Sequence, residues 1–409
     1  MKVIILTQYY PPEHGAPQNR LHDLARRFAA AGHDITIMTA MPNYPKGEVF
    51  PEYRGKFSTR EELDGVKIVR SWIFASKSKS KIPQLTVYFS FVFSAIFAGI
   101  FRLPKADFLI CESPPLFLGF SALILKTFKR ARLIMNISDL WPESAVQLGM
   151  IGPGLPLTIL EWFEKLLYRK SKLVLCQTEG IIDGVKKSCP EAETLLFPNG
   201  VDLEMFTIRE QNAKLAEEFK IEKGDFIVGY GGNHGRSQAL SQLLEAAAIV
   251  KKQSDADCRI KFLLCGDGPE KIELIEKAKK MELDNLTFLE SQSREKMGDI
   301  QSLWNIALVP LKNIELFDGA RPSKMFELMG GGIPFIFCGK GEGADVAEAS
   351  GCAAVVPPEN PAKLAEQIIK FAKLADADRQ KMGRAGREFV EKNFNRAKLA
   401  ESLMERLKQ

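Results

Sequence analysis

Two cations and a carboxylate have a spacing that could bind a charged ligand: Arg321, Lys324 and Glu327. They lie in the stretch RPSKMFELMGGGIPFIFCG, which predicts a helix ended by three glycines and then a buried strand. Pro322 suits the first helical position, because its missing N–H would have no partner there. Residues three and four apart meet on a helix surface, so Ser323, Lys324 and Glu327 are expected on neighbouring faces of one turn. An ordinary surface helix with a solvated charged face would show the same pattern.

The chemistry that this helix start favours is phosphate binding beside sugar binding. The N–H groups and the dipole of a helix N-terminus attract an anion, and nearby cations add to that attraction. Phosphate contacts are therefore expected from Arg321, Lys324 and Ser323. A carboxylate one turn further in cannot bind the same anion, so Glu327 is expected to accept hydrogen bonds from sugar hydroxyls, as a ribose-binding acid does.

Glycine-rich loops follow two predicted strands in the same half of the chain. Phe226–Gly231 leads into GGNHGR, and Ile260–Gly266 leads into GDGP. Further strands alternate with helices, which predicts a doubly wound parallel sheet with its ligand site at the carboxyl edge. Phosphate-binding roles are expected for four loop residues: Gly232, Asn233, Arg236 and Gly266. The glycine spacing is G-x-G-x-x-x-G and lacks an acid about 20 residues further on, which argues against a nicotinamide or flavin site.

The first half of the chain begins with a second unit of the same kind. Val3–Thr7 and Ile35–Thr39 read as buried strands on either side of an amphipathic helix, Gln18–Ala31, and this order predicts a parallel sheet. Gly15 lies in the loop after the first strand, where it would allow a ligand to approach the backbone. A turn with a purely structural role explains Gly15 nearly as well.

Another candidate in the first half is Asp139, which follows the predicted strand Arg132–Ile137. The segment reads SDLWPES and places Asp139 close to Trp141. A carboxylate next to an aromatic ring is a common way to bind a sugar, so Asp139 is expected to orient an acceptor hydroxyl or the donor's sugar. Capping of a helix that begins near Pro142 is the alternative role.

Composition places the chain among soluble globular proteins with two domains. Its 409 residues are 45% hydrophobic and 26% charged, and a net charge of +5 is too small to suggest a nucleic-acid-binding protein. Seven cysteines without C-x-x-C spacing suggest reduced core residues in a cytosolic protein, and the short apolar N-terminus does not predict a signal peptide. We predict domains at residues 1–205 and 206–385, followed by a C-terminal helix over 386–409.

An apolar run with three alternative roles follows the basic segment ASKSKSK. Leu85–Phe101 has 17 residues without a charge, among them five phenylalanines. A spanning helix needs about 20 apolar residues, and strands of a soluble sheet flank the run, so a transmembrane role is the least favoured. A core helix of the first domain and a helix that dips into one leaflet beside the lysines both fit.

Taken together, these motifs resemble those of retaining GT-B glycosyltransferases of family 4 over nearly the whole chain. The matching segments are YYPPE with its later Gly and Arg, GH…T…YP, DLWPES, GGNHG, CGDGPE, RPSKMFELMGGGIPF and GRAGREFVEKNF. The opening and DLWPES are similar to the branch that transfers N-acetylfucosamine-type sugars in bacterial O-antigen and capsule synthesis. The resemblance implies two facing Rossmann-like domains, the first binding the acceptor and the second the nucleotide sugar, with the last helix crossing back onto the first.

The resemblance also implies a function. A sugar, expected to be an N-acetylated 6-deoxyhexose, would pass with retention from a UDP-sugar to a polyprenyl-diphosphate-linked saccharide. The protein would be cytoplasmic and peripherally attached to the inner membrane. No metal or other cofactor is expected, and the DAD strings at 255–257 and 376–378 are interpreted as solvated turns. A UDP-sugar 2-epimerase of the same fold and a non-catalytic nucleotide-sugar-binding scaffold are the alternatives.

The chain departs from the family pattern at the donor site. Relatives usually carry a further glutamate, eight residues before the ribose-binding one and in contact with the donor sugar, but here that place is Gly319. A lysine common after the glycine loop is replaced by Gln238, and the loop arginine is displaced or replaced by Asn233. Many relatives carry a histidine where this chain has the Asp139 loop. Three catalytic cations would then have to balance the negative charge of the diphosphate: Arg236, Arg321 and Lys324.

Overall fold

The computed structural model describes residues 1–13, 15–78, 80–147, 149–253 and 259–409, which form two compact units. The first unit contains Met1–Pro198 and Ala397–Gln409, and the second contains Asn199–Arg396. These bounds differ from the predicted ones: the chain leaves the first unit after Pro198, whereas the predicted boundary is residue 205. The predicted boundary at 385 falls inside α14 (Asp376–Asn393), a continuous helix of the second unit.

The first unit is built on a sheet with strand order β3-β4-β2-β1-β5-β6-β7-β8. Its strands are β1 (Lys2–Leu6), β2 (Asp34–Ala40), β3 (Ser58–Leu63), β4 (Val66–Ser71), β5 (Phe108–Ser113), β6 (Arg132–Ile137), β7 (Leu173–Cys176) and β8 (Thr194–Leu196). Neighbouring strands pair in parallel except β3 and β4, which are antiparallel. The apolar runs that predict the inner strands are buried, as expected for a parallel sheet covered on both faces. The sequence pattern does not reveal β3, because half of its residues, STREEL, are charged and it lies at the sheet edge.

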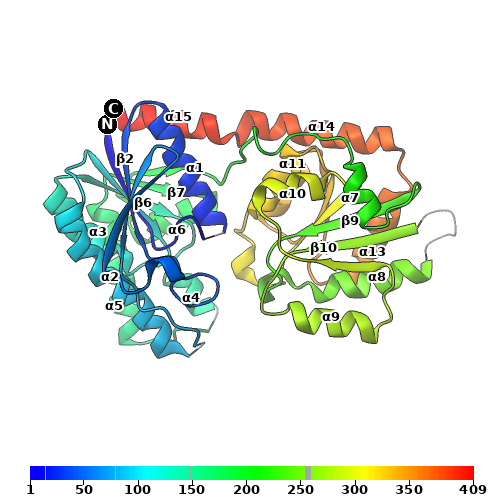
Figure 1. Cartoon of the computed structure of the whole chain (residues 1–409), viewed down its shortest axis with the longest axis horizontal. Helices are drawn as coiled ribbons and strands as arrows, with labels where there is room; N and C mark the ends of the chain where they lie inside the picture. The colour runs from blue at the N-terminus through cyan, green and yellow to red at the C-terminus, as the bar shows by residue number, and fades with distance from the viewer. Residues whose placement is uncertain (14, 79, 148, 254–258) are drawn as a thin grey trace. The chain divides into compact units, whose positions relative to one another are not determined.

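Helices cover both faces of this first sheet (Figure 1). One face packs against α2 (Lys81–Arg102), α3 (Leu118–Lys129), α5 (Leu155–Lys170) and α6 (Glu179–Ser188). The other face packs against α1 (Ala16–Ala30) and α15 (Arg396–Lys408). Four residues of α15 belong to the core of the first unit: Ala400, Leu403, Met404 and Leu407. The predicted return of the last helix to the first domain is therefore confirmed.

The second unit has strand order β11-β10-β9-β12-β13-β14, and each pairing among its described strands is parallel. The strands are β9 (Asp225–Gly231), β10 (Arg259–Cys265), β11 (Leu286–Leu289), β12 (Ile306–Pro310), β13 (Phe335–Cys338) and β14 (Ala353–Val356). The helices are α7 (Ala213–Glu218), α8 (Ser241–Gln253), α9 (Lys271–Lys280), α10 (Arg294–Gln301), α11 (Ser323–Gly330), α12 (Glu342–Ala349), α13 (Pro361–Ala372) and α14. The chain moves outward from β9 in both directions, so β9 and β12 flank a topological switch point, where parallel sheets open a crevice for ligands. The predicted α/β fold with two doubly wound sheets is confirmed.

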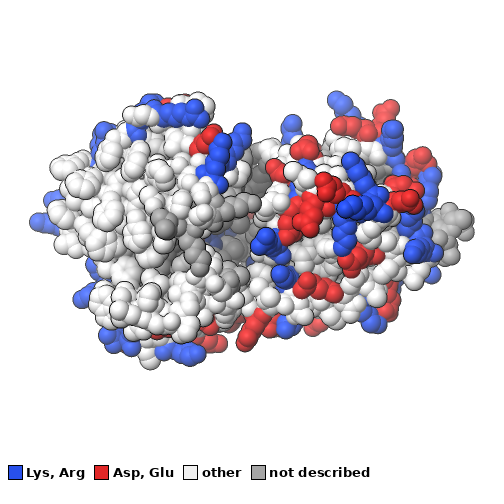
Figure 2. Space-filling model, turned by 90° about the horizontal axis from the view of Figure 1, so that it is seen from below, with Lys and Arg blue, Asp and Glu red and all other residues white. Residues whose placement is uncertain are grey.

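The helix α2 is a core helix on one side and exposed on the other. Phe91, Val92, Ala95 and Ala98 are buried in the first unit. Five apolar residues spaced by four are 39% to 79% exposed: Leu85, Phe89, Phe93, Phe97 and Phe101. Within the described residues, Pro83–Arg102 is the one helical segment long and apolar enough to cross a membrane by length and composition, and 33% of its apolar window is buried. Figure 2 shows a broad face of the first unit on which charged side chains are sparse.

Two smaller expectations concern cysteines and aspartates. The cysteines at 111, 176, 189, 265, 338 and 352 are buried and unbridged, whereas Cys258 lies outside the described residues. Asp376 begins α14 and pairs with Arg379, so the string at 376–378 is the first turn of a helix rather than the expected solvated turn. The string at 255–257 lies outside the described residues.

Candidate functional site

Two loops meet at the carboxyl edge of the second sheet, after β9 and β10. The N–H of Gly232 donates to the carbonyl of Cys265 (3.0 Å), and the N–H of His234 donates to that of Asp267 (2.8 Å). The N–H of Glu270 donates to the His234 carbonyl (2.9 Å). These backbone contacts keep the predicted cradle residues side by side: Gly232, Asn233 and Gly266.

Glycine is required in these loops because the two backbones touch. Gly266 has φ +153°, and a Cβ there would lie 1.8 Å from the Gly232 carbonyl oxygen. Gly268 has φ +157°, and a Cβ there would lie 2.5 Å from the His234 carbonyl oxygen. Residues other than glycine rarely adopt such φ values, and neither backbone can move aside without breaking the hydrogen bonds between the loops. Gly268 belongs to the predicted GDGP loop but is not among the predicted site residues.

Lys324 is anchored at the end of β9, beside the first of these loops. The helix α11 starts at Ser323, with Pro322 as its capping residue rather than its first residue as predicted. The Lys324 ammonium donates to the Tyr230 hydroxyl (3.2 Å) and lies 4.3 Å from the centre of that ring. A Cβ at Gly232 would lie 3.0 Å from Lys324 Nζ, so the glycine leaves room for the cation. The structure thus brings two predicted phosphate-binding residues together, Gly232 and Lys324.

Burial changes the acidity of Lys324. Removal from solvent lowers the pKa of its ammonium to about 8, and the nearby Glu327 carboxylate opposes this shift only in part. A desolvated cation gains more from an incoming anion than a fully solvated one does, because the local dielectric constant is lower. Lys324 therefore has the surroundings expected of a group that receives a phosphate.

The other two predicted cations lie in different surroundings. Arg321 Nη2 is 2.7 Å from Glu342 Oε2, and only 12% and 19% of the two side chains are exposed. This pair already balances the charge of Arg321, which differs from the expectation of a cation reserved for phosphate. Arg236 lies in the 3₁₀ turn after the glycine loop, where its side chain is 90% exposed and 4.0 Å from Glu270. Ser323 and Glu327 are half-buried on α11, and their ligand roles stay predictions.

In the first unit, Asp139 lies between β6 and α4 (Glu143–Gln147). Its Oδ1 accepts a hydrogen bond from Ser144 Oγ (2.5 Å). Burial raises the pKa of the Asp139 carboxyl group, and hydrogen bonds from Ser144 and the Leu140 N–H oppose that shift. This bond joins two side chains, whereas a helix cap accepts a hydrogen bond from a backbone N–H of the first turn, so the capping alternative stays a prediction too. A sugar-binding role for this half-buried carboxylate stays a prediction.

A buried polar network supports the loop after β6. Arg20 Nη2 donates to Glu112 Oε1 (2.6 Å) and to Ser138 Oγ (2.9 Å). Asn136 Nδ2 donates to Glu112 Oε2 (2.6 Å), and Gln177 Nε2 donates to Ser138 Oγ (2.6 Å). These residues come from α1 and from the carboxyl ends of β5, β6 and β7, so the network joins three adjacent strands. The sequence pattern does not predict this network, although Glu112 is the one charged residue of the strand FLICES.

Gly15 precedes α1 with extended backbone (φ 167°), a conformation open to any residue. A Cβ there would meet the amide end of Gln18, which is flexible, so this position does not require glycine. The preceding part of the loop is held by Glu13, whose carboxylate accepts hydrogen bonds from the N–H groups of Asn43 and Tyr44 (2.8 Å each). A ligand contact at Gly15 stays a prediction.

Family models match successive parts of the chain. Residues 15–200 match the model described as glycosyl transferase 4-like domain, and residues 211–389 match the model described as glycosyl transferases group 1. The chain is a GT-B glycosyltransferase. The first match contains the loop of Asp139, and the second contains both glycine loops and α11.

A relative and two solved structures are similar to this glycosyltransferase over most of its length. It is 24% identical over 336 residues to an Escherichia coli K12 chain provisionally named as the colanic acid biosynthesis glycosyl transferase WcaI, with 80% of this chain and 81% of the relative covered. Sucrose-phosphate synthase of Thermosynechococcus elongatus matches with a TM-score of 0.75 and 16% identity, over 100% of this chain and 98% of the other. The Anabaena protein HepE, solved with UDP and glucose, matches with a TM-score of 0.71 and 15% identity, over 100% and 99%. At these identities the two structures show a shared fold.

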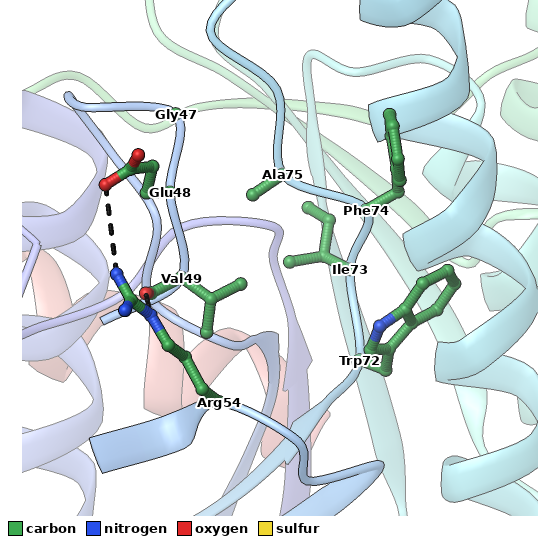
Figure 3. A pocket seen from close by; sticks show the side chains of 8 residues that line it. All are labelled: Gly47, Glu48, Val49, Arg54, Trp72, Ile73, Phe74 and Ala75. Carbon is green, nitrogen blue, oxygen red and sulfur yellow. Dashed lines mark hydrogen bonds and ion pairs between the residues drawn. The ribbon is translucent and has the colours of Figure 1, made fainter. Parts of the chain in front are cut away.

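A hollow of about 440 Å³ lies at the carboxyl end of β4 in the first unit of the glycosyltransferase. Figure 3 shows Trp72 and Phe74 on one side and Glu48 and Arg54 on the other, and the latter two form an ion pair of 3.8 Å. Glu48 also pairs with Lys77 of the basic segment (2.6 Å). The lining of this hollow includes none of the predicted site residues.

The lowered pKa of Lys324 predicts a pH dependence of UDP binding. The free ammonium is charged below its pKa of about 8 and neutral above it. A bound diphosphate would raise that pKa, so affinity should fall by about tenfold per pH unit above pH 8 while the bound group keeps its proton. Calorimetric titration of UDP between pH 7 and about 10 measures this. Lys324→Arg, which stays charged, should remove the dependence, and a flat wild-type profile would contradict the assignment of Lys324.

The buried network of the first unit predicts a stability effect. Arg20→Ala leaves Glu112 buried without its cation and should destabilise the protein by about 3–5 kcal/mol. Arg26→Ala is the matched control on the same helix, because Arg26 is 40% exposed in its pair with Asp23. It should cost no more than about 1 kcal/mol. Urea denaturation followed by circular dichroism compares the two, and equally small effects would show that the network is not important for stability.

Proposed function

We propose that this glycosyltransferase moves a hexose from a UDP-sugar to a lipid-linked saccharide in the synthesis of a bacterial surface polysaccharide. The observation that carries the proposal is the position of Lys324, which bonds to Tyr230 at the end of β9 and lies beside Gly232 of the following loop, at the switch point of the second sheet. HepE, which shares the fold, was solved with UDP and glucose, and the relative WcaI is named for colanic acid biosynthesis. These names support the donor class and the kind of product.

The second unit is proposed to hold the nucleotide sugar. Lys324, the N–H groups at Ser323 and the backbone near Gly232 and Gly266 would bind the diphosphate, and Glu327 would bind the ribose hydroxyls. Because the loops and α11 are held together before any substrate arrives, they would stabilise charge on the leaving diphosphate without reorganisation. Such fixed donors can take the role that a divalent metal has in other transferases, so we propose activity without metal.

The proposed reaction forms one bond and breaks one bond at the anomeric carbon of the donor sugar. The acceptor hydroxyl oxygen bonds to that carbon, while the bond from the carbon to the diphosphate oxygen breaks. The hydroxyl proton passes to the departing phosphate, and the configuration is retained when attack and departure occur on the same face. Asp139 would orient the acceptor hydroxyl or the donor's sugar. An N-acetylated 6-deoxyhexose is the proposed sugar, on the resemblance of the opening and DLWPES to N-acetylfucosamine-type transferases.

The first unit is proposed to contact the cytoplasmic face of the membrane that carries the acceptor. Its exposed apolar residues extend over neighbouring helices, because α2 packs on α3 and α3 packs on α5. Beyond the five residues of α2, they include Phe120, Phe128, Leu155, Ile159 and Trp162. Lys77 is paired with Glu48 and Lys79 lies outside the described residues, so this apolar surface would supply most of the attachment.

The transfer reaction is tested with the full-length protein, a panel of UDP-sugars and a polyprenyl-diphosphate-linked saccharide. We expect release of UDP together with a lipid-linked product that is longer by one sugar. Isomerisation of the sugar nucleotide without acceptor would indicate an epimerase, and binding without turnover would indicate a scaffold. In the same preparation Glu327→Ala should weaken UDP binding by about 1–3 kcal/mol, the range for a hydrogen bond to a charged group. Glu315→Ala, an exposed acid outside α11, should leave UDP affinity unchanged.

Membrane contact is tested by sedimentation with liposomes that contain anionic lipid. The wild type should sediment with the vesicles, and salt should release only part of it, because apolar burial is insensitive to screening. Replacement of Phe93, Phe97 and Phe101 by serine should leave the protein in the supernatant with an unchanged circular dichroism spectrum. Phe57→Ser is the control, since Phe57 is 56% exposed but lies outside these helices. A wild type that never sediments would contradict membrane contact.

A further inference from the structure

Glu342 places a carboxylate beside an open space at the carboxyl edge of the second sheet. A Cβ built on Gly319 would lie 4.0 Å from Glu342 Oε1. Apart from the chain neighbours of Gly319, no other atom of the described residues comes within 4 Å of that Cβ position. The space at Gly319 is therefore open to a ligand, and Glu342 faces it from the start of α12.

The backbone fixes the position of Glu342. Its N–H donates to the carbonyl of Asp318 (2.7 Å). Gly341 has φ +68°, and a Cβ there would lie 2.0 Å from the same carbonyl oxygen. On the other side, a Cβ at Gly343 would lie 2.7 Å from the carbonyl oxygen of Ala320. Glycines on both sides of Glu342 thus allow the start of α12 to approach the segment that contains Gly319.

Arg321 holds the carboxylate of Glu342 at the carboxyl edge of the second sheet, where the nucleotide sugar is proposed to bind. The ion pair of 2.7 Å joins Glu342 to the residue pair that precedes α11, the helix of Lys324 and Glu327. The order of the strands explains this meeting, because β9, β12 and β13 are neighbours. The segments that follow their carboxyl ends therefore lie in a row along the edge, and they contain Gly232, Gly319 and Glu342.

We propose that Glu342 accepts hydrogen bonds from hydroxyl groups of the donor sugar and that Arg321 is the positioning residue for its carboxylate. This inference rests on the proposed function, since it needs a UDP-sugar whose diphosphate lies at Lys324. From there the sugar extends along the edge toward β13, into the room that Gly319 leaves. A carboxylate suits this contact because its two oxygens accept several hydrogen bonds and donate none. The acid that the family resemblance implies at the place of Gly319 would thus be replaced by one from the start of α12.

The test measures UDP and UDP-sugar binding separately in Glu342→Gln. The probes are UDP and the UDP-sugar that is turned over in the panel above. The variant should bind UDP as the wild type does and lose about 10- to 100-fold in UDP-sugar affinity and in kcat/KM, as for a hydrogen bond to a charged group. Glu348→Gln, an exposed acid of the same helix, is the matched control and should change neither. Equal losses for the two probes, or no loss for either, would overturn the proposal.

Arg321→Ala distinguishes a positioning residue from a phosphate ligand. If Arg321 acts through Glu342, its loss should lower kcat/KM but not UDP affinity, and it should add little in the Glu342→Gln background, because the two changes remove one interaction. Arg321→Lys should restore part of the activity, since a cation again faces Glu342. Reduced UDP affinity in Arg321→Ala would show contact with the diphosphate and would overturn the positioning role.

A compensating change tests the location of the sugar. Gly319→Glu in the Glu342→Gln background puts a new carboxylate into the same open space, so the double variant should regain activity without a change in UDP affinity. A folded double variant that regains nothing would place the sugar elsewhere and would overturn the proposal. Failure of the wild type to bind UDP would instead count against the proposed function itself.

Discussion

The close contact between Gly266 and the carbonyl of Gly232 is the constraint on which the second unit's candidate site depends. It brings the loops after β9 and β10 together, and three backbone hydrogen bonds then hold them. The first loop carries Gly232, whose lack of a side chain leaves room for Lys324. A larger residue at either glycine would displace the cation or separate the loops. The geometry of the site is thus a consequence of backbone packing before any ligand is considered.

Charge is divided unequally around the start of α11. The ammonium of Lys324 is desolvated over Tyr230, which lowers its pKa, whereas the guanidinium of Arg321 is paired with Glu342 at 2.7 Å. A diphosphate can therefore gain most from Lys324, while the Arg321 pair presents a carboxylate, a group suited to hydroxyls. One short segment would thereby support both proposed contacts, one with the diphosphate and one with the sugar, at neighbouring positions along the sheet edge.

The first unit combines a polar network in its interior with apolar side chains on its outer helices. A buried pair such as Arg20 and Glu112 is costly to desolvate, and its value lies in fixing one arrangement of the strand ends. The outer apolar residues are instead exposed on the surface of the helices. Leu85–Phe101 was expected to be either a core helix or an interfacial one. The structure shows a helix that is buried along Phe91, Ala95 and Ala98 and exposed along a row of apolar residues that includes Phe93, Phe97 and Phe101.

The sequence by itself determined the two doubly wound sheets, the glycine loops and, to within one residue, the start of α11, because apolar runs, glycines and helix periodicity are local signals. It could not determine which distant side chains meet. Arg321 was predicted to be a phosphate cation, but the approach of Gly341 to Asp318 brings Glu342 to it. No structural role was predicted for Arg20, which meets Glu112 and Ser138 only in the folded protein. The pKa of Lys324 likewise depends on burial by Tyr230 and the loop. Such contacts join residues far apart in the chain, so only the tertiary structure decides them.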